Sequence, residues 1–137
     1  MPCVRVKPGV TFDGLKPAGV RLLAAIDRMS QILVRDLMIT CGTDSHPAMD
    51  PHTRGEAVDV RTSDLPPAVI LTLVNGLTKL LGPDFTVLYE TPVKKTDVLA
   101  SIAYFNPQAT GEHLHLQLRK NYGPWPPTEP STTGPTL

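Results

Sequence analysis

With 137 residues, of which 41% are apolar, the chain can bury one modest hydrophobic core, and a second folded domain would have no room. Its 13 basic and 13 acidic side chains cancel, so the overall charge favours neither nucleic acid nor an anionic membrane as a partner. No segment approaches the ~20 apolar residues of a membrane span, and the N-terminus lacks the apolar stretch of a secretory signal. We therefore expect one domain over residues 1–122, made in the cytoplasm.

The first part of the chain predicts an arm, a helix and a strand. Residues 1–16 carry prolines and glycines among isolated valines, which is typical of an extended arm with at most one short strand. From Pro17 to Met38 the apolar residues recur at near-helical spacing, and Pro17 suits a first helical turn. Residues 37–41 are apolar and β-branched enough for a buried strand, so the boundary between helix and strand is left open.

A polar loop and a second helix are expected next. Residues 43–55 contain prolines, histidines and aspartates, which favours a surface loop that leads into a strand over residues 56–61. Ser63 or Asp64 can cap a helix whose apolar run covers residues 69–81. Functional side chains gather on such loops when a rigid scaffold holds them, so residues 43–55 are the first place to look for chemistry.

The remaining elements complete an α+β fold. Further strands are predicted over residues 85–90, 98–105 and 113–118. Together the elements predict two helices packed on a small, mainly antiparallel sheet. Residues 123–137 are too rich in proline to continue any element, and we expect them to form a disordered tail.

Two short stretches predict a metal site. Gly55 can supply a tight turn after His52, and period-two alternation places Ala57 and Asp59 on one face of the following strand. Asp59 can then point back toward His52, and the small Ala57 between them leaves room for an ion. In the last predicted strand His113, His115 and Gln117 share one face, while three leucines share the other.

These residues match the ligand chemistry of zinc. A catalytic zinc site uses neutral imidazoles and a carboxylate in a tetrahedral array, with one corner left to water. We therefore expect His52, Asp59 and His115 to bind one Zn²⁺ per chain, which can lower the pKa of its water to about 7. Glu112, just before the last strand, is the candidate general base, and His113 is a candidate hydrogen-bond donor to an oxyanion.

The two cysteines allow more than one interpretation. Cys41 is expected to be a core residue rather than a zinc ligand, because a thiolate would add a fourth protein ligand and close the site. Cys3 and Cys41 could also form one disulfide, although free thiols are the commoner state in a chain without a secretory signal.

The pattern His-x-x-Gly-x-Ala-x-Asp, followed by a late Glu-x-x-His, resembles the zinc D-alanyl-D-alanine peptidases, a family that includes phage endolysins and is similar in fold to the hedgehog signalling domain. The resemblance covers roughly residues 40–118. It implies that His52, Asp59 and His115 bind zinc and that Glu112 is the catalytic base.

The resemblance also implies a substrate and a place of action. It implies peptidoglycan stem peptides as substrates, a DD-carboxypeptidase or endopeptidase reaction, and a protein that reaches the cell wall through a holin or on a virion. Three positions depart from the family pattern. Asp50 stands where serine is usual, Leu114 stands where an aromatic residue is usual, and residues 40–43 lack the arginine that helps to hold the substrate. Arg54 or Arg61 could replace that arginine.

Two functions therefore remain open. The first is a zinc metallopeptidase that hydrolyses cell-wall peptides. The second is a non-catalytic, zinc-stabilised binding module of hedgehog-like fold, used as a virion or surface component. The absent arginine favours the second function, whereas the presence of Glu112 favours the first.

Overall fold

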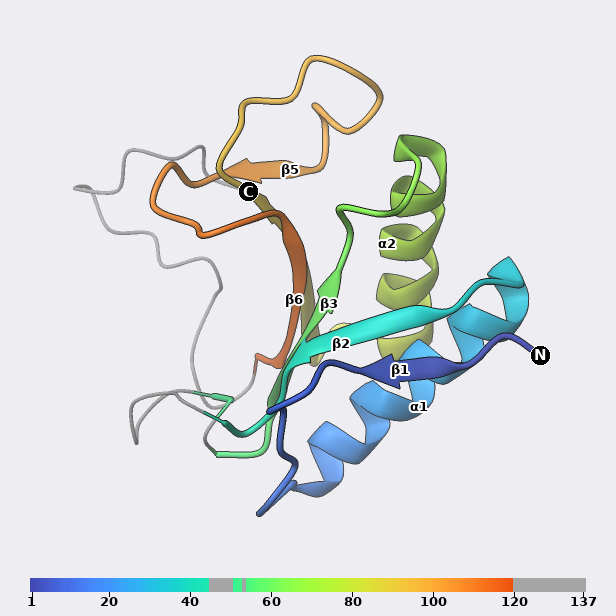
Figure 1. Cartoon of the computed structure of the whole chain (residues 1–137), viewed down its shortest axis with the longest axis vertical. Coiled ribbons are helices and arrows are strands. Elements are labelled where there is room, and N and C mark those ends of the chain that lie inside the picture. Colours follow the sequence, from blue (N-terminus) through green and yellow to red (C-terminus); the bar gives the residue numbers. More distant parts are fainter. Residues whose placement is uncertain (45–50, 53, 120–137) are drawn as a thin grey trace.

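The computed structural model describes residues 1–44, 51–52 and 54–119, in which two helices pack against one sheet (Figure 1). The elements in chain order are β1 (Val4–Val6), α1 (Pro17–Leu33), β2 (Leu37–Cys41), β3 (Ala57–Arg61), α2 (Pro67–Leu81), β4 (Phe85–Thr91), β5 (Ala103–Phe105) and β6 (His113–Leu118). The six strands lie in the order β1-β2-β3-β6-β4-β5. The α+β prediction with two helices is confirmed, and the tail expected over residues 123–137 lies outside the described residues.

The sheet is mixed, so the expectation of a mainly antiparallel sheet needs correction. The β1–β2 and β4–β5 pairs are parallel, whereas β2–β3, β3–β6 and β4–β6 are antiparallel. A parallel pair needs a long connection that returns the chain to the same end of the sheet. Helix α1 supplies that connection for β1 and β2, and residues 92–102 supply it for β4 and β5. Both parallel pairs lie at the sheet edges, and the four central strands are antiparallel.

Helix α1 ends at Leu33, five residues before the end of its apolar pattern. Val34 takes the left-handed conformation with φ of 53°, and the N–H of Arg35 donates to the carbonyl of Ser30. Leu37 and Ile39 are buried in β2, where both pair with β1 and Ile39 also pairs with β3. Burial in the sheet therefore overrides the local helical pattern in this segment.

Two other sequence predictions are wrong in detail. Helix α2 has Pro66 as its N-cap and no capping side chain, so neither Ser63 nor Asp64 plays that role. Pro67 occupies the first turn, where its missing N–H leaves one donor fewer to satisfy. The strand expected over residues 98–105 is restricted to β5, because Asp97 and Leu99 accept backbone hydrogen bonds that fold the preceding residues into turns.

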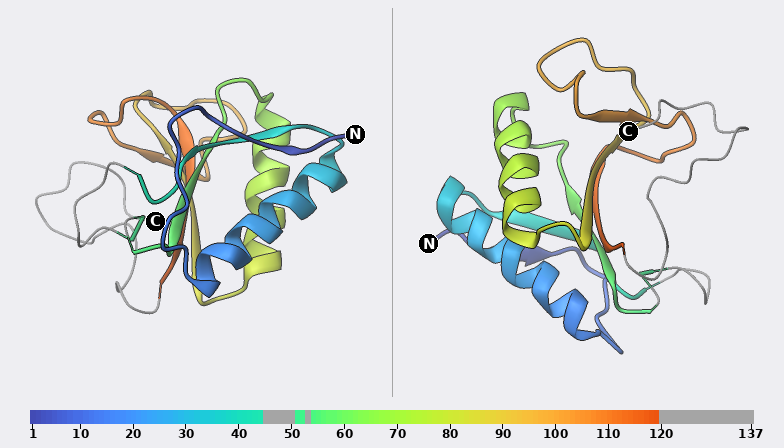
Figure 2. Two further views of the ribbon diagram at one scale, coloured as in Figure 1. Left: turned by 60° about the horizontal axis from the view of Figure 1, so that its bottom comes forward. Right: turned by 180° about the vertical axis from the view of Figure 1, so that it is seen from behind.

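The sheet has one apolar face and one polar face. Both helices cover the apolar face, as the two views of Figure 2 show, and they bury apolar side chains against it that include Leu22, Ile26, Met29, Leu73 and Leu77. Val58, Val60, Leu114 and Leu116 supply the centre of that face and are fully buried. Alternation then turns the intervening residues of β3 and β6 to the opposite face, which carries the polar side chains. None of the described helices is both long and apolar enough to cross a membrane.

The N-terminal arm, residues 1–16, contacts the connection between β2 and β3. The carbonyl of Thr11 accepts hydrogen bonds from the N–H and the hydroxyl of Thr43, and the N–H of Thr11 donates to Asp44 Oδ1 at 3.2 Å. Farther along, the N–H of Lys16 donates to the carbonyl of Gly55 at 3.1 Å. The arm, whose partner could not be deduced from the sequence, therefore contacts both ends of the β2–β3 connection.

Replacing Gly55 with alanine is expected to destabilise the fold more than the same change at Gly14. The two glycines have nearly equal positive φ values of 77° and 74°, so both alanines meet the same backbone strain of about 1–2 kcal/mol. A Cβ at Gly55 would also overlap the carbonyl oxygen of Gly14, whereas a Cβ at Gly14 meets no described atom within 4 Å. Urea unfolding should therefore give a larger loss for Gly55→Ala, and equal losses would contradict this account of the turn.

Candidate metal centre

Three polar side chains form a row across neighbouring strands on the polar face. In the antiparallel registers Cys41 of β2 lies opposite Asp59 of β3, and Asp59 lies opposite His115 of β6. Directly opposed residues in a sheet have Cβ atoms about 5 Å apart, so these side chains can reach one point in space. Strand pairing thus brings together residues that are distant in the sequence.

His52 adds a fourth side chain to this row. It belongs to a turn closed by hydrogen bonds from Gly55 N–H to the His52 carbonyl and from Glu56 N–H to the Pro51 carbonyl. Gly55 permits this turn because it adopts a positive φ of 77°. The imidazole of His52 is buried and lies edge-on to the ring of His115, with centroids 5.0 Å apart.

Three of these side chains bring nitrogen and oxygen donors to one point, which we call the donor triangle. Its corners are His52 Nε2, Asp59 Oδ1 and His115 Nδ1. Asp59 Oδ1 lies 2.9 Å from His115 Nδ1 and 3.2 Å from His52 Nε2, and the two nitrogens are 3.3 Å apart. In a tetrahedral zinc site with ligands at 2.0–2.2 Å, neighbouring donor atoms lie about 3.3 Å apart. The donor triangle therefore has the dimensions of one face of a zinc coordination tetrahedron.

Both imidazoles are oriented by hydrogen bonds at their outer nitrogens. Nδ1 of His52 donates to the carbonyl of Gly42 at 3.1 Å, and Nε2 of His115 donates to Oε1 of Gln117 at 2.7 Å. A proton on each outer nitrogen leaves the inner nitrogen of a neutral imidazole with its lone pair directed at the triangle. The carboxylate of Asp59 is also an acceptor. The lone pairs of the two nitrogens and the carboxylate oxygen repel one another at these distances. A proton or a metal ion between the three atoms removes that repulsion.

The electrostatics of the triangle favour positive charge. Burial lowers the pKa of His52, but hydrogen bonds to Asp59 and Cys41 outweigh it and raise that pKa to about 10. Burial acts to raise the pKa of Asp59, yet its hydrogen bonds to His115 and His52 bring it well below its usual range. Asp59 therefore stabilises a cation at this point of the molecule. A metal ion would have to displace the proton from His52.

Cys41 lies at this site, and the expectation that it is a core residue is wrong. It is partly exposed, and together with His52 and Asp59 it forms a group whose donor atoms lie within 4.8 Å of one another and could hold a metal ion. The cause is a register shift between Ile39 and Cys41, two β2 residues that pair with the adjacent β3 residues Val60 and Asp59. This bulge turns Cys41 to the polar face, whereas simple alternation would leave it on the core face with Ile39.

The two cysteines are free, so the disulfide considered from the sequence does not form. Cys3 is exposed and precedes β1, whose first residue, Val4, pairs with Leu37 at the start of β2. Cys41 lies at the other end of β2, about 13 Å away at the ordinary rise of a strand. A disulfide needs Cα atoms no more than about 7 Å apart.

Glu112 has three hydrogen-bond partners, none of which belongs to the donor triangle. Its carboxylate accepts hydrogen bonds from Thr62 Oγ1 at 3.3 Å, Tyr89 OH at 3.2 Å and Lys95 Nζ at 3.1 Å. Burial and the neighbouring Glu112 raise the pKa of Tyr89 to about 12, so its hydroxyl keeps its proton and donates. Glu112 and Asp59 line the same cavity. The cavity is therefore lined by both the candidate base and a candidate metal ligand.

His113 lines the cavity with both ring nitrogens engaged. Nε2 lies 3.0 Å from Glu90 Oε1, and Nδ1 donates to the carbonyl of Gly111 at 3.1 Å. Burial lowers its pKa, but the hydrogen bond to Glu90 outweighs this and the pKa of His113 is raised. The same hydrogen bond lowers the pKa of Glu90. Here His113 and Glu90 form an ion pair, and His113 could serve an oxyanion only by exchanging one of these partners.

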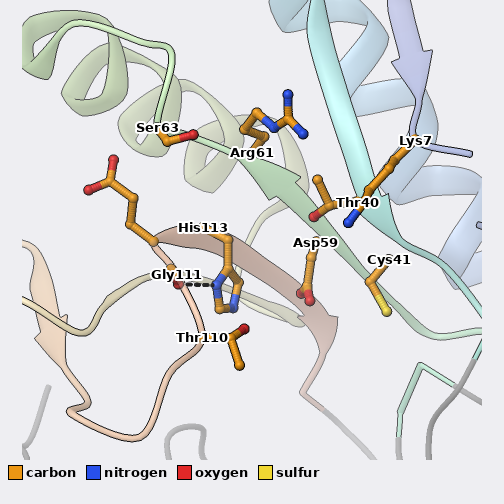
Figure 3. Close-up of a pocket in the computed structure, with 10 residues that line it drawn as sticks. Lys7, Thr40, Cys41, Asp59, Arg61, Ser63, Thr110, Gly111 and His113 are labelled. Carbon is orange, nitrogen blue, oxygen red and sulfur yellow. Dashed lines mark hydrogen bonds between the residues drawn. The ribbon is translucent and has the colours of Figure 1, made fainter.

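The cavity over the polar face has a volume of about 360 Å³ and carries two basic side chains (Figure 3). Arg61 projects into it from β3, and Lys7 reaches it from the end of β1, next to Thr40. Arg54, the other candidate for the missing arginine, is exposed and is not among the described residues that line the cavity. The positions therefore favour Arg61 over Arg54 as a substrate ligand.

Sequence reasoning missed several residues of this site. Gln117 carried a usable signal, because it shares the alternation of His113 and His115 and therefore their face. Lys95 carried none, since it lies in a loop far from Glu112 in sequence. The orienting carbonyl of Gly42 is a backbone group and could not be identified from residue types.

Comparisons of the chain with models of known protein families, with curated proteins and with solved structures find no match. The family resemblance therefore rests on the spacing of the motif residues. The function has to be argued from the donor triangle and the groups around it.

Proposed function

We propose that this protein is a zinc-dependent metallopeptidase in which His52, Asp59 and His115 hold the metal. The observation that carries the proposal is the donor triangle, whose edges of 2.9–3.3 Å match a face of a zinc tetrahedron. Outer hydrogen bonds from both imidazoles add the orienting shell that protein zinc sites ordinarily have. The polarity of the site, with one carboxylate and two imidazoles, also suits zinc better than magnesium or calcium, which prefer oxygen ligands.

The surrounding residues supply the other parts of a peptide hydrolase. A zinc ion bound here would act as a Lewis acid and would lower the pKa of a water molecule to about 7. Glu112 could accept a proton from that water, provided that its carboxylate gives up a contact with Lys95 or Tyr89 and turns toward the metal position. Arg61 and Lys7 give the cavity a positive side that suits a substrate carboxylate.

Peptidoglycan stem peptides are the substrate class that we propose. We assign them from the resemblance of the motif to zinc D-alanyl-D-alanine peptidases. The same resemblance is the basis for proposing a hedgehog-like fold and action on the cell wall. Such peptides end in a free carboxylate, which the basic side of the cavity can bind. A carboxypeptidase reaction fits this arrangement more directly than an endopeptidase reaction, because the cavity offers two cations for one carboxylate.

The proposal is tested by metal analysis and product analysis on one sample. Purified protein should contain about one zinc per chain and should release fragments from defined muropeptides, with mass spectrometry identifying the bond cut. Removal of the metal with a chelator should abolish the release, and added zinc should restore it. Protein that binds no zinc, or that hydrolyses the peptides equally well without it, would overturn the proposal.

A zinc-stabilised binding module without turnover is the second candidate. The contacts of Glu112 favour it, because Thr62, Tyr89 and Lys95 already occupy the carboxylate and none of them belongs to the donor triangle. This candidate predicts zinc content and retention on peptidoglycan, with no fragments released over long incubation. The product analysis described above separates the two functions.

A further inference from the structure

We infer that Cys41 is a fourth protein ligand, so that the metal-loaded site has two imidazoles, one carboxylate and one thiolate. This inference rests on the proposed metal site and adds a donor that the sequence analysis had assigned to the core. Four protein ligands complete a zinc tetrahedron, so in the peptidase the attacking water would have to enter as a fifth ligand or displace the thiolate, whereas the binding module needs no open position. Three independent observations support the inference: the placement of the sulfur, the local backbone and the charge of the site.

The sulfur lies within reach of the metal position. Donor atoms of Cys41, His52 and Asp59 lie within 4.8 Å of one another. In a tetrahedral zinc site the thiolate sulfur lies about 3.6 Å from a nitrogen or oxygen ligand. Relative to the donor atoms of His52 and Asp59 the sulfur therefore has to move by about 1 Å, and a rotation of the Cys41 side chain would also have to bring it into contact with an ion held by His115.

A β-bulge in β2 places the Cys41 side chain beside the proposed metal position. The β-bulge between Ile39 and Cys41 breaks the alternation of β2 and gives Cys41 the position directly opposite Asp59. Figure 3 shows Cys41 and Asp59 on neighbouring strands with both side chains extending to the same side of the sheet. Bulges of this kind redirect a side chain at functional sites, and here the redirected side chain is a thiol.

The charge of the site favours a second anionic ligand. With two neutral imidazoles and Asp59, bound Zn²⁺ leaves a net charge of +1 in a largely buried position. A Cys41 thiolate brings that charge to zero, which lowers the penalty for burying the ion. Coordination replaces the S–H bond with a metal–sulfur bond and releases the proton to solvent, and no electrons are transferred. A thiolate also raises the preference for zinc over harder cations such as magnesium or manganese.

Cobalt substitution tests the inference through a signal that does not depend on activity. Cobalt(II)-loaded wild-type protein should show a thiolate-to-cobalt charge-transfer band in the near ultraviolet, in addition to the weaker visible bands of any bound cobalt. Cys41→Ser should lose the near-ultraviolet band and keep the visible bands. Cys3→Ser is the matched control, because Cys3 is exposed and precedes β1, whose first residue pairs with the end of β2 that is far from Cys41. This variant should keep both the near-ultraviolet band and the visible bands.

The outcomes separate the thiol ligand from the metal site itself. Visible bands without a charge-transfer band in wild-type protein would overturn the role of Cys41 and leave the donor triangle intact. Absence of all cobalt bands would instead overturn the proposed metal site. Alkylation of wild-type protein by iodoacetamide gives an answer that needs no variant: zinc should protect Cys41 and not Cys3. Equal labelling of Cys41 with zinc and after chelation would contradict the inference.

Discussion

Glu112→Gln is expected to slow peptide hydrolysis by about 10²–10⁴-fold, the range that a positioned general base contributes. The amide keeps the size of the side chain and can still accept hydrogen bonds from Tyr89 and Lys95, so the loop should keep its structure. Zinc content should stay at about one per chain, because Glu112 is not a corner of the donor triangle. Steady-state hydrolysis of a defined muropeptide and metal analysis on the same preparation measure both quantities.

Asp64→Asn is a suitable control for this variant. It removes the same charge from an exposed carboxylate at the β3–α2 connection, outside the described lining of the cavity. Its rate of hydrolysis should equal that of wild-type protein. A Glu112→Gln variant with the wild-type rate would remove Glu112 from the mechanism and would leave the binding module as the better account.

Asp59→Asn is expected to weaken zinc binding by more than about 100-fold, which is the upper range for losing a group that only supports a ligand. Asp59 is the one carboxylate of the donor triangle and contacts both of its imidazoles. The amide cannot supply the negative charge that neutralises the ion. Competition with a chromophoric zinc chelator measures the change in affinity, and hydrolysis should fall with it. An affinity within a few fold of wild type would exclude Asp59 as a ligand.

The dependence of zinc affinity on pH distinguishes loss of the ligand from general unfolding. In metal-free protein the pKa of His52 is raised to about 10, so near neutral pH zinc must displace a proton from it. Displacement of the His52 proton should therefore make wild-type affinity increase by up to tenfold per pH unit until the pH approaches 10, and release of the Cys41 proton would add to this slope. Without the Asp59 carboxylate His52 holds its proton less tightly, so the variant should level off at a lower pH. An identical pH profile in the two proteins would contradict the proposed coupling.

Alternation in the last strand predicts much of the site correctly. Leu114 and Leu116 are buried beneath the helices, and His113 and His115 face the opposite side, because successive side chains of a strand point to opposite faces of the sheet. The glycine-containing turn likewise brings His52 toward Asp59, as its spacing predicts. These features depend on local geometry, which residue types specify well.

The features that could not be predicted depend on long-range pairing. The bulge that turns the Cys41 side chain to the polar face cannot be recognised from residue types. A shift of one residue in the register changes the face of every side chain that follows. The two edges of the sheet are parallel because β1 pairs with β2 and β5 pairs with β4. The local sequence pattern does not specify which strands pair. The partners of Glu112 come from three separate segments, so only the assembled fold brings Lys95 and Tyr89 together with it.

The position of β6 has a consequence for the order in which the protein matures. This strand is the last described element along the chain, yet it lies between β3 and β4 near the middle of the sheet. While the ribosome is still making residues 113–118, β3 and β4 have no partner between them and the His115 corner is missing. Domains complete their packing only when their central strands have emerged. At the proposed metal site, capture of an ion would therefore be a late event, after nearly the whole described chain has left the ribosome.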